Sequence, residues 1–235
     1  MSRSSNLFHA VSGNPVRTLL WALVMWYPLV GFCGLPHQVL NINTTLVPQS
    51  SYPQYLGALG GKMLLGARDG TGPGLWSTDG TAQGTELIRR LTVTAQTTFP
   101  GTPNFVVFGN RGYFVGDDGS SGAQPWSTDG TTAGTVRLGA LATGSNPQFL
   151  GVVGAQLVFS AADSSSVRQM YVSDGTASGT LPLTQFTGAN FGVTTDFTLS
   201  DNLFLPVSNR FYFVQVDSAY QRHIWVSDEI GRAHV

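Results

Sequence analysis

The chain has 235 residues, and its low charged fraction and formal net charge of −1 give no reason to expect nucleic acid or an anionic membrane surface as a partner. Few charges, abundant glycine and many aromatic and β-branched residues favour an all-β protein with tight turns. Cys33 is the single cysteine, so the rest of the chain offers no disulfide framework, no cysteine zinc site and no thiol nucleophile.

Residues 1–34 are typical of an export signal. Arg3 and Arg17 are the charges that precede an apolar run at 19–32, which is shorter than the roughly 20 residues needed to span a bilayer. The alternative is an uncleaved membrane anchor, in which case the chain meets the membrane through this segment only. Residues 35–50 then form a linker to the repeats.

A motif built on Asp-Gly-Thr-x-x-Gly-Thr recurs through residues 51–229, with its aspartates at steps of 50, 45 and 54 residues. An aromatic residue lies three positions before each aspartate. The members are Trp76, Asp79 and Gly80; Trp126, Asp129 and Gly130; Tyr171, Asp174 and Gly175; and Trp225 and Asp228, after which the fourth copy breaks off. Upstream, a bulky apolar residue is followed four places later by a second repeated acid: Asp69, Asp118, Asp163 and Asp217.

Each repeat has the rhythm of four short strands. In the third repeat we expect strands at 149–153, 156–161, 168–173 and 179–183. The last two are joined by the Asp-Gly turn, a strong hairpin signal because glycine accepts the positive φ that such turns require. No stretch of the mature chain shows a capped helical period.

Four strands in about 45 to 50 residues, repeated in tandem, predict an all-β fold of four-stranded blades from a partial β-propeller. A β-solenoid is the alternative, although its coils have shorter periods. Three whole repeats and a cut fourth predict a truncated chain. Residues 230–235 match the translation of a sequencing-library adapter, so we expect this tail to be non-native.

The repeat resembles the ELWxxDGT repeat of bacterial exported proteins over residues 51–228. The resemblance implies an extracellular, propeller-like protein whose biochemical role is largely undefined. The acid expected two residues before the tryptophan is replaced here by Gly74, Gln124, Gln169 and His223, so a role for that acid has no support in this chain.

For the aromatic series we expect packing between blades, with a sugar-binding platform as the alternative. The aspartate of each Asp-Gly pair is expected to cap its turn. The second acidic position, together with a neighbouring acid, offers oxygen ligands for calcium, and a calcium-stabilised adhesin is therefore one alternative function. These loop residues are Asp69, Asp117, Asp118, Asp163 and Asp217.

No catalytic motif is present, and a Ser-His-Asp arrangement among the repeats would rest on His223 alone. The sequence therefore predicts a secreted or cell-surface module that binds protein or glycan, or acts as a scaffold, without catalysis and without a cofactor. A fragment of a secreted, glycosidase-like hydrolase remains the enzymatic alternative, since carboxylates from different blades can meet in space without a motif.

Overall fold

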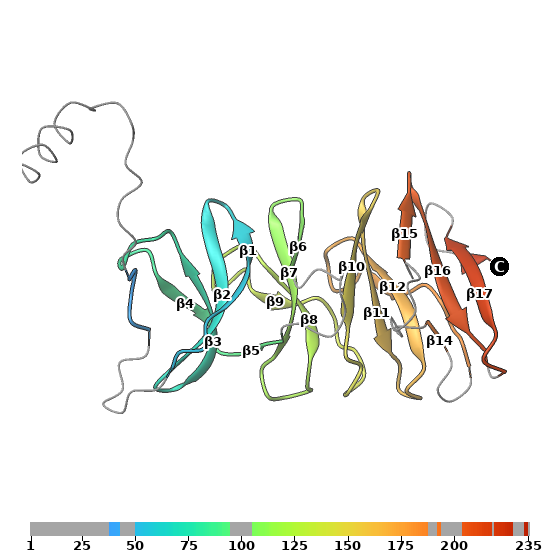
Figure 1. Ribbon diagram of the computed structural model, residues 1–235, viewed down its shortest axis with the longest axis horizontal. Helices are drawn as coiled ribbons and strands as arrows, with labels where there is room; N and C mark the ends of the chain where they lie inside the picture. Colours follow the sequence, from blue (N-terminus) through green and yellow to red (C-terminus); the bar gives the residue numbers. More distant parts are fainter. Residues whose placement is uncertain are drawn as a thin grey trace, which may run out of the picture. The chain divides into compact units, whose positions relative to one another are not determined.

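The computed structural model describes residues 38–42, 50–94, 105–187, 192–193, 204–217, 219–227 and 233–234. The predicted signal, most of the linker and Asp228 lie outside the described residues. The chain divides into two units, Met1–Gln38 and Val39–Val235, and the repeats belong to the second. All regular elements of the described residues are β-strands (Figure 1), and no helix among them is long and apolar enough to cross a membrane.

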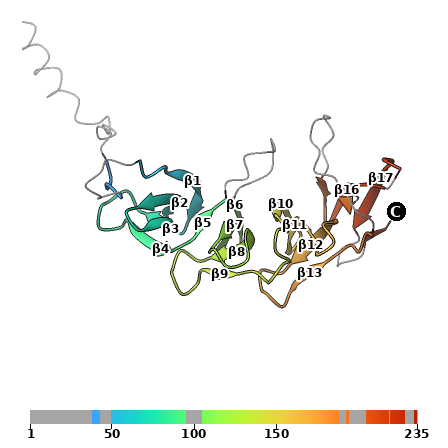
Figure 2. The same ribbon diagram turned by 90° about the horizontal axis from the view of Figure 1, so that it is seen from below.

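Four antiparallel sheets follow one another along the chain, and we call them blades 1 to 4 (Figures 1 and 2). Blades 1 and 3 have four consecutive strands each. Blade 1 consists of β1 (Gln54–Leu59), β2 (Lys62–Asp69), β3 (Gly72–Thr78) and β4 (Glu86–Arg89). Blade 3 consists of β10 (Gln148–Val153), β11 (Gln156–Ala162), β12 (Arg168–Ser173) and β13 (Thr180–Pro182).

Blades 2 and 4 each have five strands, because two short strands pair with the same edge of one long strand. Blade 2 consists of β5 (Thr92–Val93), β6 (Phe105–Phe108), β7 (Arg111–Asp117), β8 (Gln124–Thr128) and β9 (Val136–Arg137). Blade 4 consists of β14 (Gly192–Val193), β15 (Phe204–Val207), β16 (Arg210–Val216), β17 (Arg222–Ser227) and β18 (Ala233–His234).

The extra strands are the two halves of an interrupted first strand. Thr92 pairs with Asp117, whereas Phe105 pairs with Phe114, so β5 and β6 follow the same edge of β7. Residues 95–104 intervene between them, and residues 194–203 intervene at the corresponding place in blade 4. Two of the four blades therefore carry an insertion in the first strand, which explains the unequal repeat steps.

The predicted all-β fold of tandem propeller-type blades is confirmed. In the third repeat the four strands begin and end within one or two residues of the expected positions. The hydrogen bonds join consecutive antiparallel strands within one repeat, which is the blade arrangement and not the solenoid alternative. Ala233 and His234, placed by the sequence in a non-native tail, form β18, the last strand of blade 4, and pair with β17.

Hydrophobic contacts between blades form the core. We call the side of a blade that meets the preceding blade its leading face, and the opposite side its trailing face. In blade 2, Phe114 and Trp126 lie on the leading face and pack with Leu64 of blade 1, whereas Tyr113 lies on the trailing face and packs with Phe149 of blade 3. Alternation along each strand produces these two faces. Full burial of one such side chain stabilises the fold by about 1.5–3 kcal/mol.

Candidate functional site

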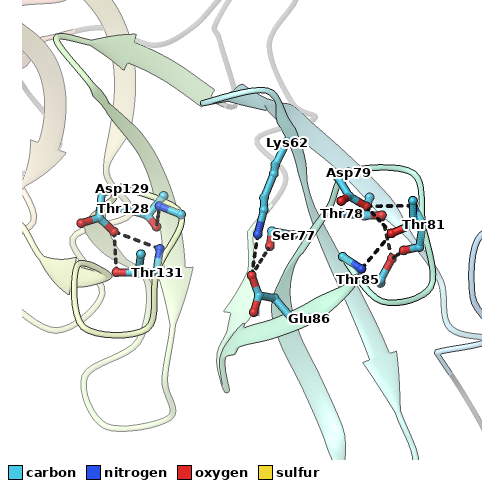
Figure 3. Close-up of polar contacts among 12 residues, drawn as sticks. Lys62, Ser77, Thr78, Asp79, Thr81, Thr85, Glu86, Thr128, Asp129 and Thr131 are labelled. Carbon is cyan, nitrogen blue, oxygen red and sulfur yellow. Dashed lines mark hydrogen bonds and ion pairs between the residues drawn. The ribbon is translucent and has the colours of Figure 1, made fainter.

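The repeated Asp-Gly turn joins the third and fourth strands and is held by the aspartate (Figure 3). In blade 1, Asp79 Oδ1 accepts hydrogen bonds from the Thr81 amide at 2.9 Å and from the Thr81 hydroxyl at 2.7 Å. The Thr81 hydroxyl in turn accepts a bond from the Gly84 amide at 2.9 Å. Asp129 and Asp174 make the same bonds in blades 2 and 3.

Two further hydroxyls complete the turn. Thr85 Oγ1 donates its proton to the Thr81 carbonyl at 2.6 Å, so the 2.7 Å bond between Thr78 and Thr85 must be donated by Thr78. Thr78 Oγ1 also accepts a bond from the Gly80 amide at 3.1 Å. Each hydroxyl therefore donates once and accepts at least once within the turn, and the same relay recurs in blades 2 and 3.

Steric constraints explain why both positions of the motif are glycine. Gly80 has φ +91°, a left-handed conformation that favours glycine. A Cβ at Gly84 would collide with the carboxylate of Asp79. Gly130 and Gly134, and Gly175 and Gly179, are constrained in the same two ways. Every fixed residue of the Asp-Gly-Thr-x-x-Gly-Thr motif thus has a role in forming the turn.

Hydrogen bonds from the turn keep the motif aspartates ionised. The Thr81 hydroxyl and then the Thr81 amide hold the pKa of Asp79 below its usual value. Thr131 and Thr176 have the same effect on the pKa values of Asp129 and Asp174. A carboxylate whose oxygen accepts amide and hydroxyl protons is a poor candidate for a general acid.

The second strand starts with a basic residue in three of the four blades, on the same end as the Asp-Gly turn: Lys62, Arg111 and Arg210. Lys62 Nζ lies 2.6 Å from Glu86 Oε1 (Figure 3). At the equivalent position Arg111 donates to the Ser127 hydroxyl at 3.1 Å and to the Gly134 carbonyl. Arg111 Nη1 also lies 3.9 Å from Asp129, and such partly exposed pairs contribute little to stability.

The second repeated acid lies at the opposite end of the blade, where the second strand turns into the third; we call these hairpins the tips. In blade 1, Asp69 Oδ1 accepts bonds from the Thr71 amide at 2.8 Å and from the Gly72 amide at 3.1 Å. Arg90 binds both carboxylate oxygens, at 2.8 and 2.5 Å. The Arg90 bonds, with those of Thr71, hold the pKa of Asp69 far below its usual range.

Each tip aspartate has a different side-chain partner. Arg137 bonds Asp118 at 2.5 Å, Gln169 bonds Asp163 at 2.8 Å, and His223 Nε2 lies 2.9 Å from Asp217. The pKa of Asp217 is lowered, first by its bond with His223 and then by the Gln221 amide. For Asp118 and Asp163 burial is the largest influence and raises the pKa, but their hydrogen bonds outweigh it and the pKa is lowered.

The acids proposed as calcium ligands are thus tied to their own hairpins. Asp117 Oδ1 accepts a bond from the Gly119 amide at 2.7 Å, and the other four acids hold tips on separate blades. Within the residues that the structure describes, no group of three or more His, Cys, Asp or Glu side chains is placed to hold a metal ion.

The repeated aromatic lies between blades in blades 2 to 4, whereas Trp76 of blade 1 packs against Leu65, Ala67 and Ile42. Trp126 is 1% exposed, its Nε1 donates to the Gly116 carbonyl at 3.0 Å, and the Arg89 guanidinium lies 4.9 Å from the ring centroid. Tyr171 stacks on Phe159 at 5.1 Å in blade 3. Trp76 is buried and Trp225 is half-buried. These rings therefore form no shared exposed platform of the kind that binds sugars.

Two buried glutamines form a feature that sequence reasoning missed. Gln124 and Gln169 occupy the place of the expected acid, two residues before the aromatic. Each bonds the backbone 17 residues further on, Gln124 at Leu141 and Gln169 at Phe186. The sequence shows a glutamine in place of the acid in two repeats, but it does not show which backbone groups these glutamines bond.

The fold and the turn geometry together define a repeat protein of propeller-type blades. No family model matches the chain, and no curated protein matches it. Among solved structures, TolB from Acinetobacter baumannii is similar, with 16% sequence identity and a TM-score of 0.39. The match covers 74% of this chain and 40% of the TolB chain.

Proposed function

We propose that the chain is an exported, non-catalytic module that binds a protein or a glycan through the tips of its blades. One observation carries the non-catalytic part: the described aspartates at both repeated positions have lowered pKa values and accept hydrogen bonds that hold turns. A glycosidase-like mechanism requires one carboxyl group with a raised pKa beside an ionised one. The repeated acids favour a structural role over that chemistry.

The tips are the favoured contact surface because they differ between blades, whereas the Asp-Gly turns are nearly identical. The four tip loops read Gly-Thr, Gly-Ser-Ser-Gly-Ala, Ser-Ser-Ser-Val and Ser-Ala-Tyr-Gln after their aspartates. Tyr220, in the last of these loops, is 79% exposed. A rigid scaffold that presents variable polar loops and an exposed aromatic is suited to recognition.

Export is proposed from the N-terminal sequence and from the resemblance to the ELWxxDGT repeat of exported bacterial proteins. We expect residues 1–34 to be removed and the mature chain to be secreted or to remain at the cell surface. Intact-mass measurement of the chain from a bacterial host tests this. Retention of Met1–Gly34 in the exported chain would favour the anchor alternative.

The function is tested by incubating the full chain with a glycan array and with a panel of nitrophenyl glycosides. We expect saturable binding to one glycan class that weakens in Tyr220→Ala, and no release of nitrophenol. Gln83→Ala, in the exposed part of an Asp-Gly turn, is the matched control and should bind normally. Turnover of a glycoside would support the hydrolase alternative and overturn the proposal. Equal loss in both variants would show that the tips are not the contact surface.

A further inference from the structure

One arginine of blade 3 lacks an acidic partner among the described residues, whereas Arg90 and Arg137 each bind a tip aspartate. This residue, Arg168, begins β12 directly after the tip of blade 3, and its side chain is half-buried. Its Nη1 donates to the Asn146 carbonyl and to the Ser160 hydroxyl, both at 3.2 Å. Burial lowers the pKa of Arg168, and no neighbouring charge contributes to the shift. A charge that is partly removed from water in this way normally has a counter-ion.

Arg168 lies on the trailing face of blade 3, at the end of the blade nearest the tip. Val158 and Met170 on this face pack with Phe213 of blade 4. Ser160 and Arg168 lie two residues from them along β11 and β12, and they therefore share the same face. The apolar contact between the two blades is thus followed, toward the tips, by a polar region on blade 3.

Two buried polar side chains near Arg168 have no hydrogen-bond partner among the described residues. Gln148 lies directly opposite Ser160 and is 9% exposed, and its Oε1 makes no hydrogen bond. Ser145 is fully buried and its Oγ is also unbonded, and the next residue, Asn146, is the one whose carbonyl Arg168 bonds. Buried polar atoms in proteins normally have a partner. The tip end of this face therefore combines an unpaired cation with two unbonded polar groups.

The fold itself does not require these polar groups. Where blade 3 has Ser160, strand register places a nonpolar residue in every other blade: Gly66, Val115 and Val214. The place of Arg168, three residues before the repeated aromatic, is an arginine again only in blade 4, and the equivalents are Pro73, Ala123 and Arg222. The tip aspartate recurs in all four blades, whereas the pair of Ser160 and Arg168 occurs in blade 3 alone. A role other than forming the blade is therefore favoured for this pair.

We propose that Arg168 binds an oxyanion that also carries a hydroxyl group, either a hydroxylated carboxylate or monohydrogen phosphate. Nε and Nη2 of Arg168, which bond no described residue, donate to two oxygens of the anion. Gln148 Oε1 accepts the proton of the ligand's hydroxyl group, and the Ser145 hydroxyl is a further donor. This inference goes beyond the proposed function and does not depend on it, because a free anion in solution is sufficient to occupy the site.

The test is isothermal titration calorimetry of the full chain with inorganic phosphate and, separately, with glucuronate, at constant ionic strength. We expect saturable binding of one of them, and the one that binds identifies the source of the oxyanion as phosphate or carboxylate. Arg168→Gln should weaken this binding about tenfold or more, because it removes the charge and the paired donors. Arg68→Gln, which removes an exposed arginine beside the tip of blade 1, is the control and should bind like the wild type. A wild-type chain that binds neither anion, or equal weakening in the two variants, overturns the proposal.

A second pair of ligands tests the part assigned to Gln148. Sulfate replaces phosphate, and cyclohexanecarboxylate replaces glucuronate, since neither replacement has a hydroxyl proton to donate at neutral pH. The wild type should bind the hydroxylated anion more tightly than its replacement, and Gln148→Leu should lose this preference. Equal affinity of the wild type for both members of the pair would contradict the part assigned to Gln148.

A conservative variant keeps the test valid if Arg168→Gln does not fold. Arg168→Lys retains the positive charge but not the planar pair of donors, so its affinity for the anion should lie between those of the wild type and Arg168→Gln. Circular dichroism of each variant establishes that the fold is retained. A folded Arg168→Lys that binds the anion as tightly as the wild type would contradict recognition by the paired donors of the guanidinium.

Discussion

Gln169 bonds both backbone polar groups of Phe186: Oε1 accepts from the amide at 2.9 Å and Nε2 donates to the carbonyl at 2.8 Å. Gln124 makes the same two bonds with Leu141, at 3.0 and 3.5 Å. Both glutamines are buried. A carboxylate could accept the amide proton but could not donate to the carbonyl. The departure from the acidic residue of the ELWxxDGT pattern therefore suits the bonds observed here.

Gln124→Glu should destabilise the chain by about 1–3 kcal/mol near pH 7, because it buries a charge and leaves the Leu141 carbonyl without its donor. Burial should raise the pKa of the introduced carboxyl in the folded state. Its neutral form is then favoured by folding, so the lost stability should return as the pH falls through that raised pKa. Urea unfolding at several pH values measures this. Gln83→Glu, at an exposed turn position, is the control, and equal stability of the two variants would contradict the prediction.

Thr128→Val should destabilise blade 2 by about 1–3 kcal/mol, because it removes the acceptor of the Gly130 amide and the donor to Thr135 in a buried turn. Thr128→Ser keeps the hydroxyl and should be close to neutral, since Ser173 occupies this place in blade 3. Chemical denaturation of both variants provides the comparison. A Thr128→Val variant as stable as the wild type would show that the hydroxyl relay does not stabilise the fold.

Acid should unfold the chain through its repeated aspartates. Their folded-state pKa values are lowered from 3.8, so they contribute stability above the unfolded pKa, and this stability is lost as the pH falls toward the folded values. The free energy of unfolding should therefore decrease on acidification below about pH 5. Asp69→Asn, which cannot form the ion pair with Arg90, should be less stable near neutral pH and should depend less on pH. If the free energy of unfolding of Asp69→Asn varied with pH as that of the wild type does, Asp69 would not contribute to the acid dependence.

Calcium should leave the thermal midpoint of the chain unchanged. The tip carboxylates already accept protons from backbone amides and from side chains such as Arg90 and Arg137, and a cation would have to displace these donors. Differential scanning calorimetry with added calcium and with chelator checks this. A midpoint that rises with calcium and falls with chelator would support the adhesin alternative.

Local patterns were predictable and long-range pairings were not. The strands of the third repeat followed from turn residues and β-forming runs, because both signals lie within a few neighbouring residues. The interruption between Val93 and Phe105 was missed, since a two-residue strand such as β5 has no periodicity to detect. The ion pair of Asp69 with Arg90 was also missed, because its partners are 21 residues apart and meet only once β4 has folded onto β3.

A carboxyl-carbon NMR titration of the full chain tests most directly the claim that the repeated acids hold turns and do not perform chemistry. The account predicts that the described aspartates at both positions titrate below their ordinary value of 3.8: Asp69, Asp79, Asp118, Asp129, Asp163, Asp174 and Asp217. An aspartate among them that stays protonated well above that value would supply the carboxylic acid that a hydrolase needs, and would contradict the non-catalytic function proposed here.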